Sequence, residues 1–299
     1  MRDLTSARLA RLGDLETVEL STPHGRATIA RLGATVVEYR DASDTDVLWL
    51  SPTSRLDGSR PIRGGIPVCW PWFGAHPSDP DRGAHGFARH LPWQIERMDN
   101  DERQAIAVFS LTDDDTTRAQ WPHPFRLTLT VRLDERLHLE LAAENRGDAE
   151  WQVSEALHSY FRVRDARGVH IDGLAGLRYW DKQQGGVRGR QSSDVIVQPP
   201  IDRVFFDHRG EAVIHDAGRR LRIAKDGSAT TVVWNPGPEG VRGFDDIPDD
   251  AWSTMLCVET ANALDNAYRL GPGERHVLSA TIATDVGTGI ATEKAVTDG

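Results

Sequence analysis

Strict alternation of apolar and polar residues is the feature that most limits how this chain can fold. In its clearest run every second residue is apolar: Phe125, Leu127, Leu129, Val131 and Leu133. After Asp134-Glu135, which has the composition of a turn, the alternation resumes at Leu137. Period-two alternation places apolar residues on one face of a strand, so the stretch from Phe125 to Ala143 predicts a β-hairpin with one buried and one wet face.

Similar patterns predict strands along most of the chain. These are Thr17–Ser21, Arg26–Arg31, Thr35–Arg40, Ala105–Leu111, Trp151–Val163, Val195–Val197, Glu211–His215, Arg219–Ala224, Thr230–Trp234, Thr254–Glu259 and His276–Thr284. Only the first dozen residues and Asp249–Trp252 hint at helix. Many short strands separated by turn signals predict an all-β sandwich. No repeat or linker divides the chain, so we expect one domain over residues 1–299, ordered from about 15 to 285 and frayed from about Gly287.

Charge and cysteine usage narrow the classes of function. The formal net charge of −10 argues against broad nucleic-acid binding and against an anionic membrane surface, but not against an anionic small substrate. Cys69 and Cys257 are far apart and lack metal-type spacing, so we expect reduced thiols. Met1 to Leu12 contains no apolar run of signal-peptide length, and no segment approaches membrane-span length. These features predict a cytoplasmic protein, which we expect to be a monomer.

One stretch, from Arg60 to Trp93, fits no simple strand. It is dense in Gly, Pro, Trp, Arg and His. Long irregular loops inside compact domains are uncommon and are usually functional or disordered, and disordered tracts are poor in aromatic residues. The aromatic residues of this stretch therefore favour a packed, functional loop. Four of them could stack on the apolar face of a sugar or act as core wedges: Trp70, Trp72, Phe73 and Phe87.

Seven short motifs occur in order along the chain. They are Arg63-Gly64-Gly65-Ile66-Pro67, His85-Gly86-Phe87-Ala88-Arg89, Trp121-Pro122-His123-Pro124-Phe125, Ala156-Leu157-His158-Ser159-Tyr160-Phe161, Tyr179-Trp180-Asp181-Lys182, Ile201-Asp202-Arg203-Val204 and Cys257-Val258-Glu259-Thr260-Ala261-Asn262. In these motifs the chain resembles the glucose-6-phosphate 1-epimerase (hexose-6-phosphate mutarotase) family, a branch of the aldose 1-epimerase superfamily. Each motif is weak alone, whereas seven in register are specific.

The resemblance implies a fold, a reaction and a site. The fold would be an antiparallel β-supersandwich of galactose-mutarotase type. The reaction would interconvert the α and β anomers of a hexose 6-phosphate without metal or other cofactor, with His158 as general acid and Glu259 as general base. The substrate-binding residues would be Arg63, His85, Arg89 and Asp202. Some members carry Gln before the His-Gly-Phe-Ala-Arg motif, where this chain has Ala84; that contact would be absent or replaced by backbone.

The residue types suit this chemistry, although each has a structural alternative. Histidine titrates near neutrality and a partly buried carboxylate can act as a base; otherwise His158 is a core histidine and Glu259 a solvated strand end. Arginine grips phosphate through paired N–H donors; otherwise Arg63 and Arg89 pair with a nearby Asp79 or Asp81. Asp202 accepts hydrogen bonds from sugar hydroxyls or forms an Asx turn.

Other functions remain open at this point. Glu155 with Glu259 is a conceivable glycosidase pair, and Cys69 with His85 a conceivable Cys/His pair that nothing orients. An epimerase for free or otherwise modified aldoses and a non-catalytic sugar-binding module share the fold. The spacing of His76, His85 and His90 fits no strong metal pattern.

Overall fold

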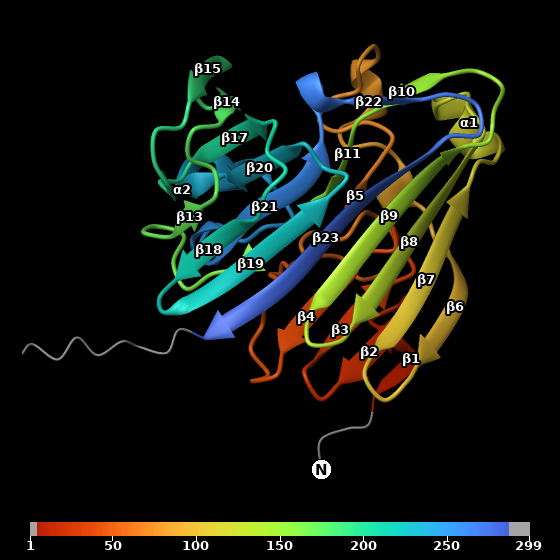
Figure 1. Ribbon diagram of the computed structural model, residues 1–299, viewed down its shortest axis with the longest axis horizontal. Helices are drawn as coiled ribbons and strands as arrows, with labels where there is room; N and C mark the ends of the chain where they lie inside the picture. The colour runs from red at the N-terminus through yellow and green to blue at the C-terminus, as the bar shows by residue number, and fades with distance from the viewer. Residues whose placement is uncertain (1–4, 287–299) are drawn as a thin grey trace, which may run out of the picture.

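Antiparallel sheets make up most of the regular secondary structure of the molecule, shown in Figure 1 as a computed structural model that describes residues 5–286. A nine-stranded sheet runs in the order β16 (Val195–Ile196), β13 (His170–Asp172), β18 (Ala212–Asp216), β19 (Arg219–Asp226), β23 (Arg275–Val286), β9 (Leu137–Asn145), β8 (Phe125–Leu133), β7 (Ala105–Thr112) and β6 (Gln94–Asn100). The all-β prediction is confirmed.

An eight-stranded sheet carries the strands that matter most below. It runs in the order β15 (Val187–Arg190), β14 (Arg178–Asp181), β17 (Ile201–Phe206), β20 (Thr230–Asn235), β21 (Met255–Asn262), β11 (Glu155–Leu157) and β5 (Val68–Cys69), while β12 (Tyr160–Arg162) also pairs with β21. A four-stranded sheet consists of β1 (Ser6–Leu12), β2 (Leu15–Thr22), β3 (Gly25–Ala30) and β4 (Val36–Asp41), and β10 (Trp151–Val153) pairs with β22 (Tyr268–Leu270).

Helix is scarce within residues 5–286. Two short α-helices are present, α1 (Asp115–Gln120) and α2 (Gly237–Gly240). Short 3₁₀ turns lie at Pro80–Arg82, Ala88–His90, Val241–Gly243, Ala251–Thr254 and Leu264–Asn266. Among these described residues, none of the helices has the length and apolarity needed to traverse a lipid bilayer.

The apolar faces of the alternating strands meet in one core. Leu129 of β8 lies opposite Phe109 of β7 and Leu141 of β9, and all three side chains are fully buried. Cross-strand pairs of this kind are the unit of sheet stabilisation. The four-stranded sheet packs against β6–β8, as Figure 1 shows, and its Val18 belongs to the same buried cluster as Leu129 and Ile282.

The strand predictions hold where the alternation is long, and they need correction elsewhere. The helix hinted at in the first dozen residues is replaced by a strand in the part that the structure describes: β1 spans Ser6–Leu12 and pairs with β2 through a turn at Gly13, whose φ is +58°. The predicted strand Trp151–Val163 is divided into β10, β11 and β12. The helix hint at Asp249–Trp252 corresponds to the 3₁₀ turn Ala251–Thr254. The predicted frayed end from Gly287 lies outside the described residues.

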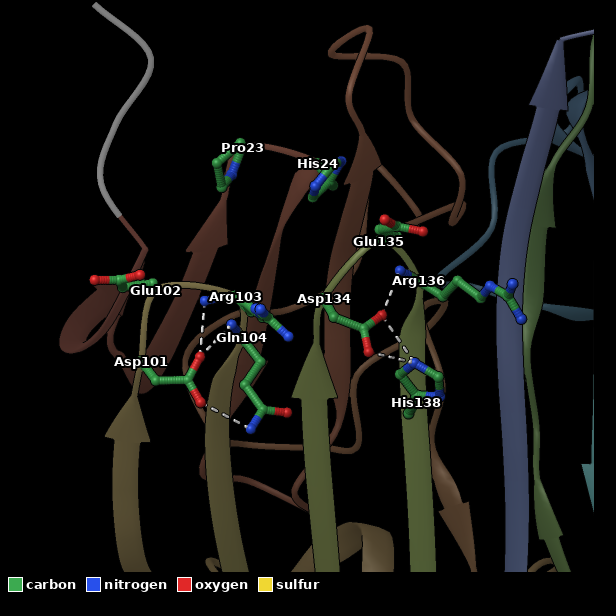
Figure 2. A pocket seen from close by; sticks show the side chains of 10 residues that line it. All are labelled: Pro23, His24, Asp101, Glu102, Arg103, Gln104, Asp134, Glu135, Arg136 and His138. Atoms are coloured by element: carbon green, nitrogen blue, oxygen red, sulfur yellow. Dashed lines mark hydrogen bonds and ion pairs between the residues drawn. The ribbon is translucent and has the colours of Figure 1, made fainter.

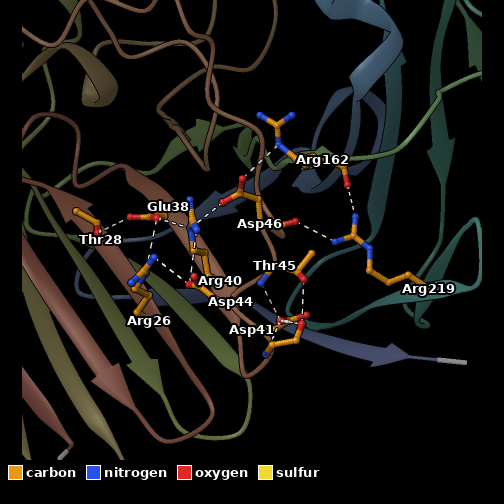
Figure 3. A network of polar contacts seen from close by, with 11 residues as sticks. Arg26, Thr28, Glu38, Arg40, Asp41, Asp44, Thr45, Asp46, Arg162 and Arg219 are labelled. Carbon is orange, nitrogen blue, oxygen red and sulfur yellow. Dashed lines mark hydrogen bonds and ion pairs between the residues drawn. The ribbon is translucent and has the colours of Figure 1, made fainter. Parts of the chain in front are cut away.

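A polar network fastens the loop after β4 to the rest of the molecule (Figure 3). The Arg219 guanidinium on β19 donates to the backbone oxygens of Asp46, at 2.9 Å, and of Arg162. The Arg40 Nε on β4 lies 2.8 Å from an Asp46 carboxylate oxygen. Within the loop, Asp41 Oδ1 accepts from the backbone N–H groups of Ser43 and Thr45. Side-chain charges thus tie the four-stranded sheet to β12 and β19.

Candidate active site

Strand β21 is the centre of the candidate site because it is buried on both faces. Its even-numbered residues Leu256 and Val258 join the main core between the sheets. Its odd-numbered residues point to the opposite face, where Cys257 packs with Tyr160 and Trp49. By the same period of two, Glu259 lies on this second face.

The neighbouring strands add polar residues to that face through their register. Val232 of β20 lies directly opposite Glu259, and Trp234, two residues along β20, lies opposite Asp202 of β17. Residues that are opposite, or two apart on one strand, share a face of a sheet. The pairing therefore collects Asp202, Trp234 and Glu259 from three consecutive strands.

His158 reaches the same face from β11 and β12. On β11, Leu157 lies opposite Thr260, and on β12, Tyr160 lies opposite Cys257. His158 and Ser159 lie between these two strands. Because both strands pair with β21 in the same register, His158 lies opposite Glu259. The measured distance between His158 Nε2 and Glu259 Oε1 is 3.5 Å. Two residues about a hundred positions apart in sequence are thus adjacent across a ladder.

These residues line a cavity of about 160 Å³. The lining consists of Arg63, Phe73, His85, His158, Tyr160, Lys182, Asp202, Val232, Trp234, Phe244 and Glu259. Five of the six residues predicted from the sequence are in this set; Arg89 is not. The cavity combines aromatic walls with a few polar groups, which is typical of small-molecule sites.

Burial controls the protonation of the central pair. Burial is the largest cause that lowers the pKa of His158 well below its usual value, and the charges of Arg89 and Arg63 lower it further. Burial, followed by the charge of Asp202, raises the pKa of Glu259 well above its usual value, and Lys182 opposes that rise. His158 Nδ1 and Glu259 Oε2 are buried and have no hydrogen-bond partner within residues 5–286. Unpaired buried polar atoms are costly, and at an active site they are free to bind substrate.

His158 is held in place by an aromatic stack. Its ring lies parallel to the Tyr160 ring, with centroids 4.8 Å apart and an interplanar angle of 10°. The Tyr160 hydroxyl accepts a hydrogen bond from Arg63 Nη1 at 3.1 Å. The His158 backbone N–H donates to the Pro67 carbonyl at 3.0 Å. Stacking and backbone contacts therefore orient the imidazole toward Glu259.

Arg63 is neutralised from behind by Asp246. Its Nε lies 3.0 Å from Asp246 Oδ1, and its guanidinium lies 5.1 Å from the centre of the Phe244 ring. The alternative that Arg63 pairs with Asp79 or Asp81 is wrong: Asp79 pairs with Arg82. The carboxylate that holds Arg63 lies far along the chain, which no local pattern reveals.

His85 is placed by a strained turn. It has a φ of +69° and is followed by Gly86, where an added Cβ would meet the Trp70 carbonyl oxygen at 2.0 Å. Only glycine fits such a close approach. The His85 Nδ1 accepts from the Gly74 N–H at 3.3 Å, and its ring centroid lies 5.4 Å from that of His158. Burial, then the charge of Arg89, lowers the pKa of His85 to about 3, so it lines the cavity as a neutral ring.

Arg89 lies behind His85 rather than on the cavity wall. Its Nη2 donates to the Ala84 carbonyl at 2.8 Å, and its buried Nε has no partner among the described residues. Arg89 is in no ion pair with Asp79 or Asp81 in the part of the chain that the structure covers. Ala84 therefore meets Arg89 through its backbone carbonyl.

Lys182 is a cavity residue to which the sequence analysis gave no role. It lies in the turn after β14, and its Nζ is 3.6 Å from Asp202 Oδ2. Burial raises the pKa of Asp202, and Lys182 opposes that rise. Other lining or supporting residues without a sequence-based role are Tyr160, Trp234, Phe244 and Asp246. Tyr160 and Lys182 belong to the seven motifs, and that membership is the sequence signal for a role in the site. Asp246 belongs to none of the motifs, so no sequence signal indicates its role.

The aromatic residues of the irregular stretch divide into two groups. Trp70, Trp72 and Phe87 are buried in the main core, so they are wedges beneath the loop. Phe73 alone of the four lines the cavity. Its backbone N–H donates to Ser154 Oγ at 2.9 Å, which holds the ring at the wall.

The rival chemistries do not fit the geometry. Burial raises the pKa of the Cys69 thiol to about 12, so it is a poor nucleophile beside His85. Glu155 lies on the face of β11 that points away from the cavity, where it accepts from Tyr268 and Asn262. His158, Cys257 and Glu259 offer three possible metal ligands within 4.8 Å of one another. Burial raises the pKa of Cys257 well above its usual value, so in the absence of a cation this group is a neutral thiol.

A second hollow, of about 820 Å³, lies between hairpin tips and shares no lining residue with the first cavity (Figure 2). It is lined by Pro23, His24, Asp101, Glu102, Arg103, Gln104, Asp134, Glu135, Arg136 and His138. None of the predicted site residues lies there. Its one internal His/Asp pair is satisfied, because His138 Nε2 contacts both Asp134 oxygens and its Nδ1 contacts Thr281.

Comparison with known proteins shows the family to which the chain belongs and its fold. The profile of a family described as "Aldose 1-epimerase" matches residues 16–283. A Salmonella typhimurium protein named "Putative glucose-6-phosphate 1-epimerase" is 34% identical over 255 residues, covering 84% of this chain and 85% of the relative. An Escherichia coli protein of the same name is 34% identical over 256 residues and covers 85% of each chain.

Solved structures show the same architecture. A Salmonella typhimurium protein described as a "putative mutarotase" superimposes with a TM-score of 0.87 at 31% identity, covering 96% of both chains. The galactose 1-epimerase of Lactobacillus acidophilus superimposes with a TM-score of 0.76 at 14% identity, covering 95% of this chain and 99% of that one. The predicted β-supersandwich of galactose-mutarotase type is therefore confirmed.

Proposed function

The chain belongs to the aldose 1-epimerase family and is an enzyme that interconverts sugar anomers, and on that premise we propose that His158 and Glu259 carry out the proton transfers on a hexose 6-phosphate. One observation carries the proposal: His158 Nε2 and Glu259 Oε1 lie 3.5 Å apart on the wall of the cavity. The anomeric hydroxyl oxygen and the ring oxygen of a pyranose are bonded to the same carbon. Two proton-handling atoms this close together can address both oxygens at once.

In the proposed mechanism Glu259 removes the proton from the anomeric hydroxyl. The bond between the anomeric carbon and the ring oxygen breaks, and His158 delivers a proton to the ring oxygen. The open-chain aldehyde rotates about the bond next to the carbonyl, and the ring hydroxyl attacks the other face while both transfers reverse. General acid and general base catalysis each contribute roughly 10²–10⁴-fold.

The proton count of the pair fits this cycle. Burial favours a neutral imidazole and a protonated carboxyl, so the two groups together hold one proton near neutral pH. A hydroxyl group that donates to Glu259 stabilises its carboxylate form, and the shared proton is then available to His158. The pair thus needs to exchange a proton only with the sugar.

We expect kcat/KM to be flat around neutral pH and to fall at acid pH with a midpoint below 6.5. As pH falls, the pair takes up a second proton only at acid pH, because the pKa of His158 is lowered. As pH rises, the pair keeps its one proton, because the pKa of Glu259 is raised. The profile is measured on a free hexose, because a sugar phosphate titrates with a second pKa of about 6. An acid limb centred above 6.5 would contradict this assignment.

Two cationic side chains favour a phosphorylated substrate. Arg63 and Lys182 both line the cavity, in a protein whose net charge is −10. Arg63 already has Asp246 as a close partner, whereas the contact of Lys182 with Asp202 is 3.6 Å and looser. We therefore assign the larger share of phosphate binding to Lys182, with Arg63 beside it and Arg89 acting on His85. The names of the enteric relatives also point to glucose 6-phosphate.

The second candidate function is epimerisation of free hexoses. It is favoured because Arg63 and Lys182 already have carboxylate partners, Asp246 and Asp202, and so need no phosphate to balance their charge. Saturation-transfer NMR between the anomeric protons of glucose and of glucose 6-phosphate separates the two. Faster exchange of the phosphorylated sugar supports the proposal, and a preference for the free sugar would contradict it.

Replacing Lys182 with methionine is expected to raise KM for glucose 6-phosphate by about tenfold or more, since a charge-assisted hydrogen bond contributes about 1.5–3 kcal/mol. KM for free glucose should change little, because methionine keeps most of the side-chain volume. Steady-state kinetics on both sugars gives the two ratios. Arg82→Met, at a surface ion pair outside the cavity, is the control. An equal rise in KM for both sugars would mean that Lys182 does not bind the phosphate.

The proposed setting is the cytoplasm. Cys69 and Cys257 are both free and buried, as expected of a protein that works where thiols stay reduced.

A further inference from the structure

Two histidines and two aspartates gather at the edge of the nine-stranded sheet, outside the candidate active site. His170 of β13 lies directly opposite His215 of β18, and Asp172 is two residues from His170 on the same face. Asp194, immediately before β16, follows the register that pairs Ile171 with Val195 and so lies opposite Asp172. Three neighbouring strands therefore present these four side chains on one surface.

We propose that His170, Asp172 and His215 form a binding site for a divalent transition-metal ion such as Zn²⁺. One ligand atom of each residue lies within 4.8 Å of the others. His215 Nε2 and Asp172 Oδ2 are 2.6 Å apart, and the two imidazole rings are stacked with centroids 4.2 Å apart. Ligand atoms about 2.0–2.2 Å from one zinc ion are roughly 3.4 Å from each other in a tetrahedron. The separations in this set, from 2.6 Å to at most 4.8 Å, bracket that spacing.

The donor set suits zinc and related ions. Imidazole nitrogen and carboxylate oxygen are common zinc ligands, and Asp194 beside Asp172 offers a fourth. Two neighbouring carboxylates also repel each other, and a bound cation relieves that repulsion. The cation across the ladder, Arg220 opposite His215, has its own partner in Asp285 at 3.6 Å. His215 and Asp172 are partly exposed, at 27% and 42% of their side chains, so an ion can reach them.

A comparison within the same protein shows what sets this cluster apart. His138 also contacts an aspartate, Asp134, at the hollow shown in Figure 2. Both ring nitrogens of His138 are occupied, by Asp134 and by Thr281, and no second histidine completes a ligand set there in the part of the chain that the structure describes. His138 is therefore a matched control for a histidine–aspartate contact without a metal site.

An ion at the proposed site would cross-link β16, β13 and β18. The segment that follows β16 leads directly into β17, which carries Asp202. The role is structural, and it does not depend on the reaction proposed above. Anomer exchange in the presence of a chelator tests that separation, because the proton-transfer pair needs no ion at this edge.

The test is titration of chelator-treated protein with ZnCl₂ by calorimetry and with Co²⁺ by visible absorption. We expect one equivalent to bind, with the spectrum of tetrahedral cobalt, and the melting temperature to rise with zinc. His215→Ala and His170→Ala should each weaken binding by at least about tenfold and remove the thermal shift, whereas His138→Ala should leave both unchanged.

Three results would overturn the inference. One is the absence of saturable binding by the wild-type protein. Another is an equal effect of His138→Ala and His215→Ala, which would indicate weak binding to any surface histidine. The third is loss of binding in Glu259→Gln with retention in His215→Ala, which would move the ion to the cavity. Circular dichroism of each metal-free variant checks that it is folded. If His215→Ala does not fold, His170→Ala provides the same test.

Discussion

His158→Ala and Glu259→Gln are each expected to lower kcat for anomer exchange of glucose 6-phosphate by about 10²–10⁴-fold. Each substitution removes one of the two proton-transfer groups that lie 3.5 Å apart on the cavity wall. The double variant should be little worse than either single one, because an acid and a base that act in one step are not additive. Saturation-transfer NMR with the uncatalysed exchange subtracted measures all three.

Glu155→Gln is the matched control for this experiment. Glu155 is buried like Glu259, and burial raises its pKa to about 7, but its side chain points away from the cavity toward Tyr268 and Asn262. We expect its kcat to stay within a few-fold of the wild type. A large loss in Glu155→Gln with a stable fold would revive a two-carboxylate mechanism. Unchanged exchange in either His158→Ala or Glu259→Gln would remove the proposed one.

Trp70→Ala is expected to lower the free energy of unfolding by about 3–5 kcal/mol, which is a large part of the 5–15 kcal/mol typical of a folded protein. The Trp70 ring is fully buried, with its centroid 4.6 Å from that of Phe125, 5.0 Å from that of Trp121 and 5.8 Å from that of Phe87. Its removal leaves a cavity under the loop that carries Phe73 and His85. Urea unfolding gives the free energy, and the melting temperature should fall by on the order of 10 °C.

The conservative change Trp70→Phe tests the same idea with less disturbance. It keeps an aromatic ring in contact with Phe125, so we expect a loss of about 1–2 kcal/mol. A loss below about 1 kcal/mol in Trp70→Ala would show that the ring is not a core wedge. A normal melting temperature with reduced sugar affinity would instead indicate that Trp70 contacts the sugar.

Strands with one buried face were predictable from their alternation, whereas strands buried on both faces were predicted less evenly. Strands β20 and β21 were predicted from their apolar runs, and β17 was not. The hairpin of β8 and β9 was placed within two residues because burial alternates along all of β8 and along most of β9. Strand β17 escaped prediction: its burial runs through Ile201 to Phe206 without alternation, since one face packs on the core and the other lines the cavity. Strand β1 was mistaken for a hint of helix because its exposed Leu9 breaks the expected pattern.

The candidate site divides in a similar way. His158 and Glu259 were expected from their motifs, and the structure brings them together. Their proximity depends on strand register, which no local pattern contains. Lys182 was missed because a lysine in a turn normally points to solvent. Asp246 was missed because it acts on Arg63 from a part of the chain far away in sequence.

The shared register of β11, β12 and β21 separates two properties of the site. The proposed acid and base face each other between the β11–β21 and β12–β21 pairings, so backbone geometry sets their separation. Residues such as Phe73, Lys182 and Phe244, by contrast, come from turns and loops around the rim. Substitutions in those loops can change which sugar is admitted without moving the two facing residues. Substrate preference and the proposed chemical step therefore depend on different parts of the scaffold.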